Sequence, residues 1–366
     1  MKIGILAMRY ATNYGGILQT YGLFKFLKEQ GHSVFVINYK NSGKNSIASI
    51  LSKIERRFTE NSHGKTSHSV PTRPMTQEYR QNFIDFKNCY LNYTESVDES
   101  NISDVCANLD AVIVGSDQIW NDVFTNKLVY YFEWKFLNKK IAYAACTIQN
   151  RPLKSRKAHI RKLLEGFNCI TVRDENTAKY VTQFGLSKPP IVVDPSCLYD
   201  YHDLIADNPI GRPYILTYIL SDEISGGNAN AIKIIKDSIG DIPVVSVCIP
   251  SLSSVAERIS DIFIENATPQ EWVNLFYHAS FVYTDSFHGI MFSMKFKKQF
   301  IAYMKDGQRK SRLQDLIKRY NLSNIVTSAD EIRNVISDSL DYDKISKILT
   351  SNINESKQIL NEAVNS

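Results

Sequence analysis

The sequence predicts an α/β protein of two domains, each built on a parallel sheet, with a cleft between them. Three observations lead to this prediction. The chain has 366 residues, which is long for one core and sufficient for two. Apolar segments of strand length alternate with amphipathic helical stretches, in two successive series. The stretch YDYHDLIADNPIGRP between the series, residues 199–213, is polar and contains prolines, as linkers do.

The first series contains short segments rich in Val, Ile or Ala and bounded by turn residues, as is typical of buried strands. We expect strands at Lys2–Ala7, Ser33–Asn38, Ala111–Val114, Ile141–Ala145, Cys169–Val172 and Ile191–Val193. A helical pattern at Ile17–Lys28 and an aromatic stripe from Tyr79 to Tyr90 lie between these strands. Such β-α alternation favours a parallel sheet that is covered on both faces.

The second series follows Pro209 and repeats the alternation. We expect strands at Tyr214–Leu220, Val244–Ile249, Phe281–Thr284 and Phe300–Tyr303. Helices are expected at Ala229–Ser238, Gln270–His278, His288–Phe296 and Arg312–Tyr320. The domains are therefore placed at 1–205 and 206–340, followed by a C-terminal helix at 341–366. The polar segment 41–77 holds little core material and is interpreted as an insertion in the first domain.

Composition narrows the class of protein. Hydrophobic residues make up 43% and charged residues 22%, as in ordinary globular domains. No apolar run approaches 18 residues, so no transmembrane helix is expected, and the N-terminus lacks the pattern of a signal peptide. The six cysteines are spread singly without a CxxC pair, which disfavours a zinc or redox site. We expect a reduced, cytoplasmic protein without a metal.

The net charge of +5 is concentrated in one part of the chain. Nine Lys or Arg and only two Asp lie between Lys295 and Arg319. A solvated basic face would explain this excess, and so would an anionic ligand or contact with the inner face of an anionic membrane. No nucleic-acid partner is expected.

The first candidate site is the turn RYATNYGG, residues 9–16, between the first strand and its helix. Asn13 and Gly15 tolerate a positive φ, and the helix that follows presents free N–H groups to an anion. Arg9 and Tyr14 exceed what a simple crossover needs, although a turn without a ligand remains an alternative. Gln19 lies one helical turn further on and is included in this candidate site.

Two further candidate sites follow predicted strands. In VIVGSDQIWN, residues 112–121, Asp117, Gln118 and Trp120 come directly after a buried strand, and polar groups beside a Trp suit a sugar. In ITVRDENTAKYV, residues 170–181, Arg173 ends a strand. Its planar guanidinium suits a carboxylate or phosphate, but a structural pair with Asp174 or Glu175 is equally open.

The fourth candidate site is TDSFHG, residues 284–289. A strand ends at Thr284, and Asp285 or Ser286 is expected to cap a helix that begins near His288. The positive end of that helix disfavours a protonated imidazole, whereas a bound anion would favour it. His288 is therefore the best candidate for a group that transfers a proton.

Taken together, these motifs resemble the polysaccharide pyruvyl transferase family. NYGGILQTYGL, VGSDQIWN, TVRDE, VVDPSCLY and TDSFHGIMFS occur in the order of that family, over roughly residues 1–320. The resemblance implies two Rossmann-like domains in an arrangement similar to GT-B glycosyltransferases. It also implies transfer of a pyruvyl group from phosphoenolpyruvate to a glycan acceptor, nucleotide-linked or lipid-linked, without a cofactor.

The resemblance assigns roles to the candidate residues. His288 would deliver a proton to the enol methylene carbon, and Asp117 would help to deprotonate the acceptor hydroxyl. The donor's anionic groups would meet Arg173, Arg312, Ser286 and Lys295. The acceptor would meet the first turn and the segment after the third strand, through Arg9, Asn13, Tyr14, Gly15, Gln19, Gln118 and Trp120.

One position departs from the family's pattern. Relatives often have an Arg-hydrophobe-His triplet where this chain has Ser286-Phe287-His288. Either Arg312, Arg9 or Lys295 substitutes for that arginine, or the donor is not phosphoenolpyruvate. Two alternative functions therefore stay open: a glycosyltransferase that uses a nucleotide sugar, and a non-catalytic glycan-binding module in a polysaccharide assembly complex.

Overall fold

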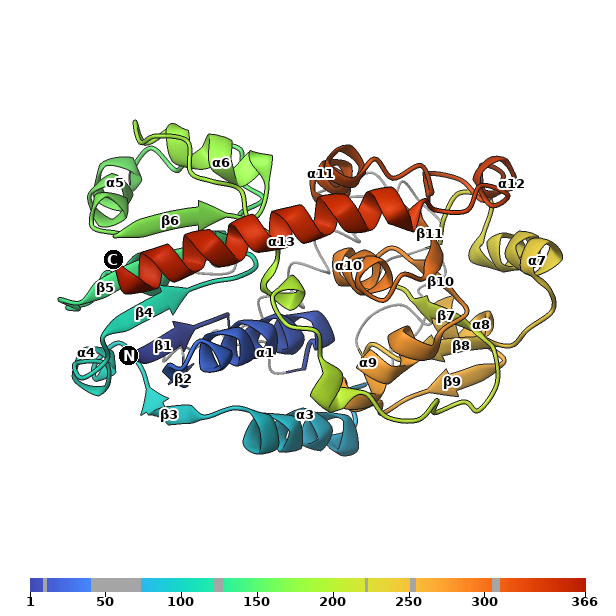
Figure 1. Ribbon diagram of the computed structural model, residues 1–366, viewed down its shortest axis with the longest axis horizontal. Coiled ribbons are helices and arrows are strands. Elements are labelled where there is room, and N and C mark those ends of the chain that lie inside the picture. The colour runs from blue at the N-terminus through green and yellow to red at the C-terminus, as the bar shows by residue number, and fades with distance from the viewer. Residues whose placement is uncertain (9–11, 41–73, 122–127, 221–222, 251–254, 305–309) are drawn as a thin grey trace.

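The computed structural model describes residues 1–8, 12–40, 74–121, 128–220, 223–250, 255–304 and 310–366 (Figure 1). The expected insertion at 41–77 falls almost entirely outside these residues. In the part of the chain that is described, no helix is long and apolar enough to cross a membrane.

The first half of the chain forms a parallel six-stranded sheet. Its strands are β1 (Lys2–Leu6), β2 (Ser33–Tyr39), β3 (Tyr93–Val97), β4 (Ala111–Val114), β5 (Lys139–Ala145) and β6 (Cys169–Val172). They lie in the order β3-β2-β1-β4-β5-β6, the Rossmann order, which reverses between β1 and β4. Such a reversal leaves a crevice at the carboxyl ends of these two strands, where ligands bind in doubly wound folds.

Helices cover both faces of this sheet. One face packs on α1 (Tyr14–Glu29), α3 (Gln77–Tyr90) and the last helix of the chain, α13 (Tyr342–Asn365). The other face packs on α4 (Ile102–Val105), the 3₁₀ turn η1 (Leu128–Tyr131), α5 (Lys157–Glu165) and α6 (Glu175–Thr182). Asn13 and Asp174 cap α1 and α6 through their side-chain oxygens, which explains where these helices begin.

The second half repeats the architecture. Its strands are β7 (Ile215–Tyr218), β8 (Val244–Val247), β9 (Ile262–Ile264), β10 (Phe281–Thr284), β11 (Gln299–Tyr303) and β12 (Ile325–Val326). They lie in the order β12-β11-β10-β7-β8-β9, so the reversal comes between β7 and β10. Its helices are α7 (Asn228–Ile239), α8 (Val255–Arg258), α9 (Pro269–His278), α10 (Phe287–Lys295), α11 (Lys310–Tyr320) and α12 (Ile332–Val335). The prediction of two α/β units on parallel sheets is confirmed.

The expected strand at Ile191–Val193 is wrong. Ile191 makes only an isolated bridge to Val172, and the chain then enters the 3₁₀ turn η2 (Pro195–Cys197). The N–H of Val193 donates to the Ser356 hydroxyl of α13 at 3.0 Å instead of to a strand. Pro190, which has no N–H, further limits pairing here. The edge strands β3, β9 and β12 were not expected, because they are short or polar.

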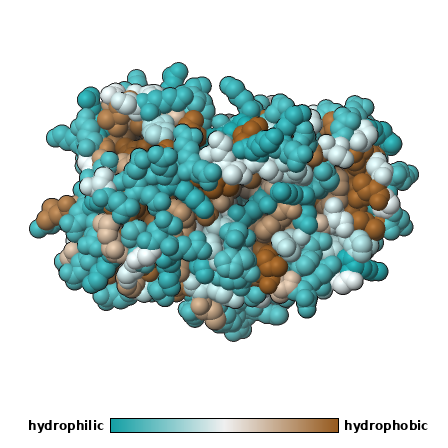
Figure 2. Space-filling view, viewed as in Figure 1, coloured by the Kyte–Doolittle hydropathy of each residue, from teal (hydrophilic) through white to brown (hydrophobic). Residues whose placement is uncertain are grey.

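One hydrophobic core continues through both halves. It contains apolar residues of both sheets together with α1, α3, α9, α10 and α13. The long helix α13 lies across the two halves (Figure 1). Its Tyr342 hydroxyl donates to the Ser293 carbonyl of the second half, and its Val364 carbonyl accepts from Lys139 of the first. The face over α13 is largely hydrophilic, with hydrophobic residues in separate small patches (Figure 2).

Aromatic packing joins the first turn of α1 to α9. Tyr14 stacks on Trp272, with ring centroids 5.8 Å apart, and its hydroxyl donates to the Ala267 carbonyl at 2.7 Å. Nearby, Asn266 accepts hydrogen bonds from Thr76 and Asn82 and donates to Glu78. The two halves are therefore held together by polar and apolar contacts beside the crevice.

We predict that Trp272→Ala lowers the free energy of unfolding by about 3–5 kcal/mol, the usual cost of truncating a buried Trp. Tyr277→Ala is the control on the same helix, where the side chain is 40% exposed, and it is expected to cost about 1 kcal/mol or less. Urea unfolding monitored by circular dichroism measures both. Equal losses in the two variants would show that the buried packing of Trp272 contributes little.

Candidate functional site

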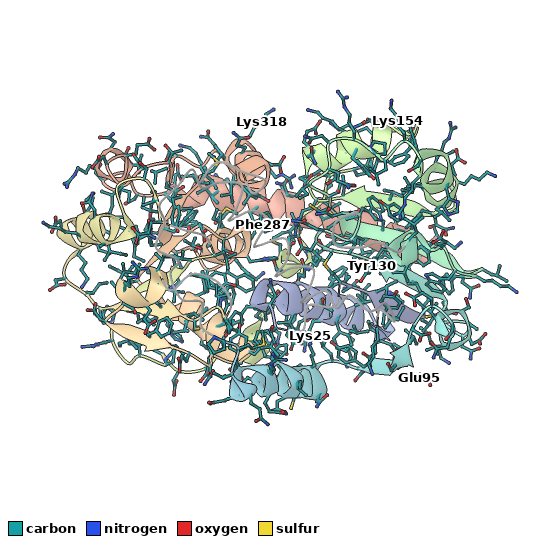
Figure 3. All side chains as sticks on the ribbon, turned by 180° about the vertical axis from the view of Figure 1, so that it is seen from behind. Lys25, Glu95, Tyr130, Lys154, Phe287 and Lys318 are labelled. Atoms are coloured by element: carbon teal, nitrogen blue, oxygen red, sulfur yellow. The ribbon has the colours of Figure 1, made fainter. Side chains whose placement is uncertain are left out.

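The candidate site lies where segments from both sheets meet at strand carboxyl ends. The first sheet supplies the start of α1, the segment after β4 and the segment after β6. The second supplies the start of α10, directly after β10, where Phe287 lies at the centre of the molecule (Figure 3). The turn η2 lies between them and contacts both α1 and α10. Most of the candidate residues are therefore brought to one region.

His288 lies against the first turn of α1. A Cβ atom built on Gly15 would stand 2.1 Å from Nδ1 of His288 and 2.4 Å from its Cγ. No side chain fits in that space, so glycine is required at position 15 by the imidazole ring of the other domain. The two helix N-termini thus meet at His288, whose side chain is 12% exposed.

Short polar side chains start both helices. The Asn13 side chain accepts from the Gly16 N–H at 2.9 Å, and the Ser286 hydroxyl accepts from the Gly289 N–H at 3.3 Å. Each satisfies one of the N–H groups that a helix start leaves unpaired. Ser286 is 2% exposed and serves as a cap here, rather than as a group that faces the crevice.

Arg173 is the centre of a buried charge network. Its Nη1 donates to Asp194 Oδ2 at 2.8 Å, and its Nη2 donates to Asp117 Oδ1 at 2.9 Å. Its guanidinium carbon lies 4.5 Å from the centre of the Phe287 ring. His288 Nε2 lies 3.8 Å from Asp194 Oδ2. The network therefore connects the segments after β4 and β6 to η2 and to His288.

The buried carboxylates keep Arg173 charged. Burial by itself lowers the pKa of the guanidinium, but the Cys146 thiol and the Asp117 and Asp194 carboxylates raise it well above its ordinary value. Arg173 is 3% exposed. The structural alternative to its expected role in gripping the donor is therefore present, although its partners are Asp117 and Asp194 rather than Asp174 or Glu175. Only its Nε lacks a hydrogen-bonding partner among the described residues.

The segment after β4 turns sharply to place Asp117. Gly115 has a φ of +133°, and a Cβ there would stand 2.0 Å from the Tyr143 carbonyl oxygen. The Ser116 hydroxyl donates to the Ala144 carbonyl at 2.7 Å, and Asp117 itself has a φ of 65°. This close packing on β5 directs the Asp117 carboxylate to Arg173.

Three residues expected to meet the acceptor are engaged in structural contacts instead. Trp120 is fully buried, stacks on Tyr131, and donates to the Tyr130 carbonyl at 3.3 Å. Gln118 accepts from Asn121 at 2.7 Å and is buried, and Tyr14 lies in the aromatic contact described above. The polar groups beside Trp120 therefore belong to a buried turn of the core, and Trp120 presents no exposed ring face on which a sugar could stack.

Gln19 is the exception among the buried candidates. It is 1% exposed, and neither polar atom of its amide has a partner among the described residues. It follows Gly15 by four residues and so lies on the same face of α1 as the His288 ring. Long helical side chains extend toward the helix N-terminus, which for α1 is the end that meets His288. A buried amide without a hydrogen bond is costly, so we expect a water molecule or a ligand hydroxyl to pair with Gln19.

The candidate cations are not all brought to His288. Lys295 lies seven residues further along α10, about 10 Å along the helix axis, with its Nζ 5.3 Å from the centre of the Tyr201 ring. Burial lowers the pKa of its amine. Arg312 lies in the first turn of α11, but its side chain is outside the described part of the structure. Arg9 lies outside the described residues altogether. Within the described residues, no cluster of three metal-ligating side chains occurs.

Sequence reasoning missed two residues of this region. Asp194, in the motif VVDPSCLY, receives no role from the sequence, although an acidic residue directly after an apolar run is a signal of a functional position. Arg319 of α11 donates to the Arg173 carbonyl at 3.1 Å and to Asp315 at 2.8 Å. A pocket adjoins this contact and is lined by both halves: Arg173, Asp174, Val193, Asp194, Phe287, Met291, Asp315, Leu316, Arg319 and Tyr320.

We predict that Arg173→Met lowers the free energy of unfolding by about 3–5 kcal/mol, because two buried carboxylates lose their partner. The matched control is Arg161→Met, which removes an exposed Arg–Glu165 pair at the same 2.8 Å distance. That change is expected to cost about 0–1 kcal/mol. Chemical unfolding of both variants measures the difference. A loss below about 1 kcal/mol for Arg173→Met would contradict the structural role.

The arrangement of the two sheets is shared with solved structures of sugar-nucleotide proteins. UDP-GlcNAc 2-epimerase from Neisseria meningitidis, solved with UDP-GlcNAc, is 12% identical over 99% of each chain, with a TM-score of 0.53. UGT89C1 from Arabidopsis thaliana, solved with UDP-L-rhamnose, is 12% identical over 99% of this chain and 98% of its own, with a TM-score of 0.53. At such low identity the likeness concerns the fold alone, and it confirms the predicted GT-B-like pair of Rossmann-like domains.

The curated proteins contain no match to this chain. The family model described as polysaccharide pyruvyl transferase matches residues 13–306, from the cap of α1 to just beyond β11. This range includes Gly15, Asp117, Arg173, Asp194 and His288, the residues that the structure brings together. The chain therefore belongs to the polysaccharide pyruvyl transferase family.

Proposed function

We propose that this protein transfers a pyruvyl group from phosphoenolpyruvate to sugar hydroxyls of a polysaccharide precursor. The observation that carries the proposal is the placement of His288 in the first turn of α10, where its ring lies against Gly15 in the first turn of α1. A helix N-terminus attracts anions, and phosphoenolpyruvate carries both a carboxylate and a phosphate. An imidazole beside such an anion is suited to hold and deliver a proton.

The proposed chemistry proceeds in two additions. His288 gives a proton to the methylene carbon of the enol, which leaves the central carbon electrophilic. A sugar hydroxyl attacks that carbon and releases its proton, and the C–O bond to phosphate breaks. A second hydroxyl of the same sugar then closes the cyclic ketal. Two hydroxyl protons are released in all: one restores the proton of His288, and the other leaves with inorganic phosphate.

We assign roles to the surrounding residues, supported by where they lie. We assign the acceptor to Asn13, Gln19 and Asp117, which belong to the first domain. We assign the donor's anionic groups to the helix N-termini together with Arg312 and Arg9. Arg312 is favoured because later residues of α11 line the pocket beside Phe287. Lys295 is not retained, because it lies at the far end of α10.

We predict that His288→Gln lowers kcat by roughly 10²–10⁴-fold, the usual contribution of a general acid. The fold is expected to persist, because glutamine is polar and of similar length. His159→Gln is the control, since the ring of His159 is 51% exposed on α5 and pairs only with Glu133 in the described contacts. Steady-state kinetics with circular dichroism as a fold check measure both. Near wild-type turnover in His288→Gln would make the residue structural.

The donor is identified by which product is released. We expect phosphate release from phosphoenolpyruvate that depends on a glycan acceptor, tested with a panel of nucleotide-linked and lipid-linked sugars. Phosphoenolpyruvate at 100 times its Kd should add about 2.7 kcal/mol to the stability, with UDP-GlcNAc as the comparison ligand. Release of a nucleoside diphosphate would instead indicate a glycosyltransferase. Glycan binding without turnover of any donor would indicate a binding module.

A further inference from the structure

We propose that Asp194 is the positioning residue of His288, and that Arg173 acts on the reaction through Asp194 rather than by touching the donor. This inference rests on the proposed function, because it assigns His288 a proton to transfer. It assigns a role to Asp194, which has none from the sequence motifs. It also accounts for the burial of Arg173.

The Asp194 carboxylate is held in place by two kinds of donor. Its Oδ1 accepts from the Ser196 N–H at 2.9 Å, which fixes the side chain at the start of η2. Its Oδ2 accepts from Arg173 Nη1 at 2.8 Å and lies 3.8 Å from His288 Nε2. The same oxygen thus faces the guanidinium and the imidazole. The carboxylate is fully buried, so solvent does not screen this arrangement.

The other side of the imidazole is fixed by backbone. The Nδ1 side packs on Gly15, where no Cβ fits, and Phe287 contacts the ring at 5.3 Å between centroids. Asp194 provides a carboxylate on the Nε2 side. The orientation of the ring therefore depends on both Gly15 and Asp194, and a displacement of Asp194 would leave the Nε2 side without that carboxylate.

The electrostatic balance at His288 depends on Asp194. The first turns of α1 and α10 contain no acidic residue, so both helix N-termini oppose a protonated ring. Arg173, beyond Asp194, opposes it as well, and Asp117 offsets Arg173. Asp285, before α10, accepts from the Leu220 N–H of the second sheet. The Asp194 carboxylate lies 3.8 Å from Nε2 of the ring, and its full negative charge at that distance favours the protonated form.

Arg173 is buried and held by two carboxylates. Both terminal nitrogens bind carboxylates, its side chain is 3% exposed, and its carbon lies over the Phe287 ring. Arg173 holds Asp194 in place through the 2.8 Å contact, so its effect on turnover passes through the protonation and orientation of His288.

The test is the titration of His288 in Asp194→Asn, a change that keeps the shape and removes the charge. Histidine ring NMR of the full chain resolves the signals of its seven histidines, and His288→Gln assigns the one of interest. We expect the titration midpoint of His288 to fall by about one pH unit or more. At a pH above the midpoint, kcat should fall about tenfold for every pH unit by which the midpoint falls. The pH profile of kcat should move by the same amount.

Asp200→Asn is the matched control. Asp200 lies on the same segment and pairs with His202, but both side chains are exposed, at 74% and 66%. It should change the signal of His202 and leave that of His288 unmoved. An unchanged His288 midpoint in Asp194→Asn overturns the inference.

If that variant does not fold, the titration of His288 in the wild-type protein decides. A His288 midpoint above about 6.5, the ordinary histidine value, requires a facing anion and supports the inference, and a lower midpoint overturns it.

The two proposals fail in different ways. A shifted midpoint without any turnover of phosphoenolpyruvate supports the pairing of Asp194 with His288 and contradicts the proposed function. Turnover of phosphoenolpyruvate with an unmoved midpoint supports the function and overturns the role of Asp194. The NMR measurement needs no substrate, so neither result depends on the acceptor.

Discussion

The contact between the His288 ring and Gly15 is the constraint on which the rest of the site depends. It brings α1, which follows β1 of the first sheet, against α10, which follows β10 of the second sheet. Both strands lie where the strand order of their sheet reverses. Any side chain at position 15 would separate the two helices or displace the ring. The turn that precedes α1 is therefore shaped by a residue 273 positions away, because Gly15 and His288 meet only after both sheets have formed.

Burial determines what the charges around that contact do. The Arg161–Glu165 and Arg173–Asp194 pairs have the same 2.8 Å separation, yet the first is half exposed and the second is not. An exposed pair contributes little because water and salt screen it, whereas a buried carboxylate without its partner is strongly unfavourable. Arg173 therefore fixes the relative positions of the segment after β4, the segment after β6 and η2. His288, the candidate proton donor, lies against this rigid network.

The continuous core explains how two separate sheets can present one site. Tyr14 and Trp272 stack across the halves, and α13 packs on both. These contacts place the carboxyl ends of β1 and β4 opposite those of β7 and β10. A transferase needs its acceptor and donor groups at such a meeting point, since proximity of the reacting groups provides much of the rate enhancement.

The sequence by itself determined the parallel sheets, the two-domain organisation and the helix starts at Asp174 and Ser286, whereas it predicted α1 only from Ile17. Those features depend on periodicity and on caps that reach only three residues along the chain. Tertiary structure alone decided the partners of Arg173, which lie 21 and 56 residues away, and the burial of Trp120. It also brought Asp194 to His288 and left Lys295 at the wrong end of α10. A residue type states which interactions are available, but only the packed chain determines which partner comes within reach and whether water is excluded.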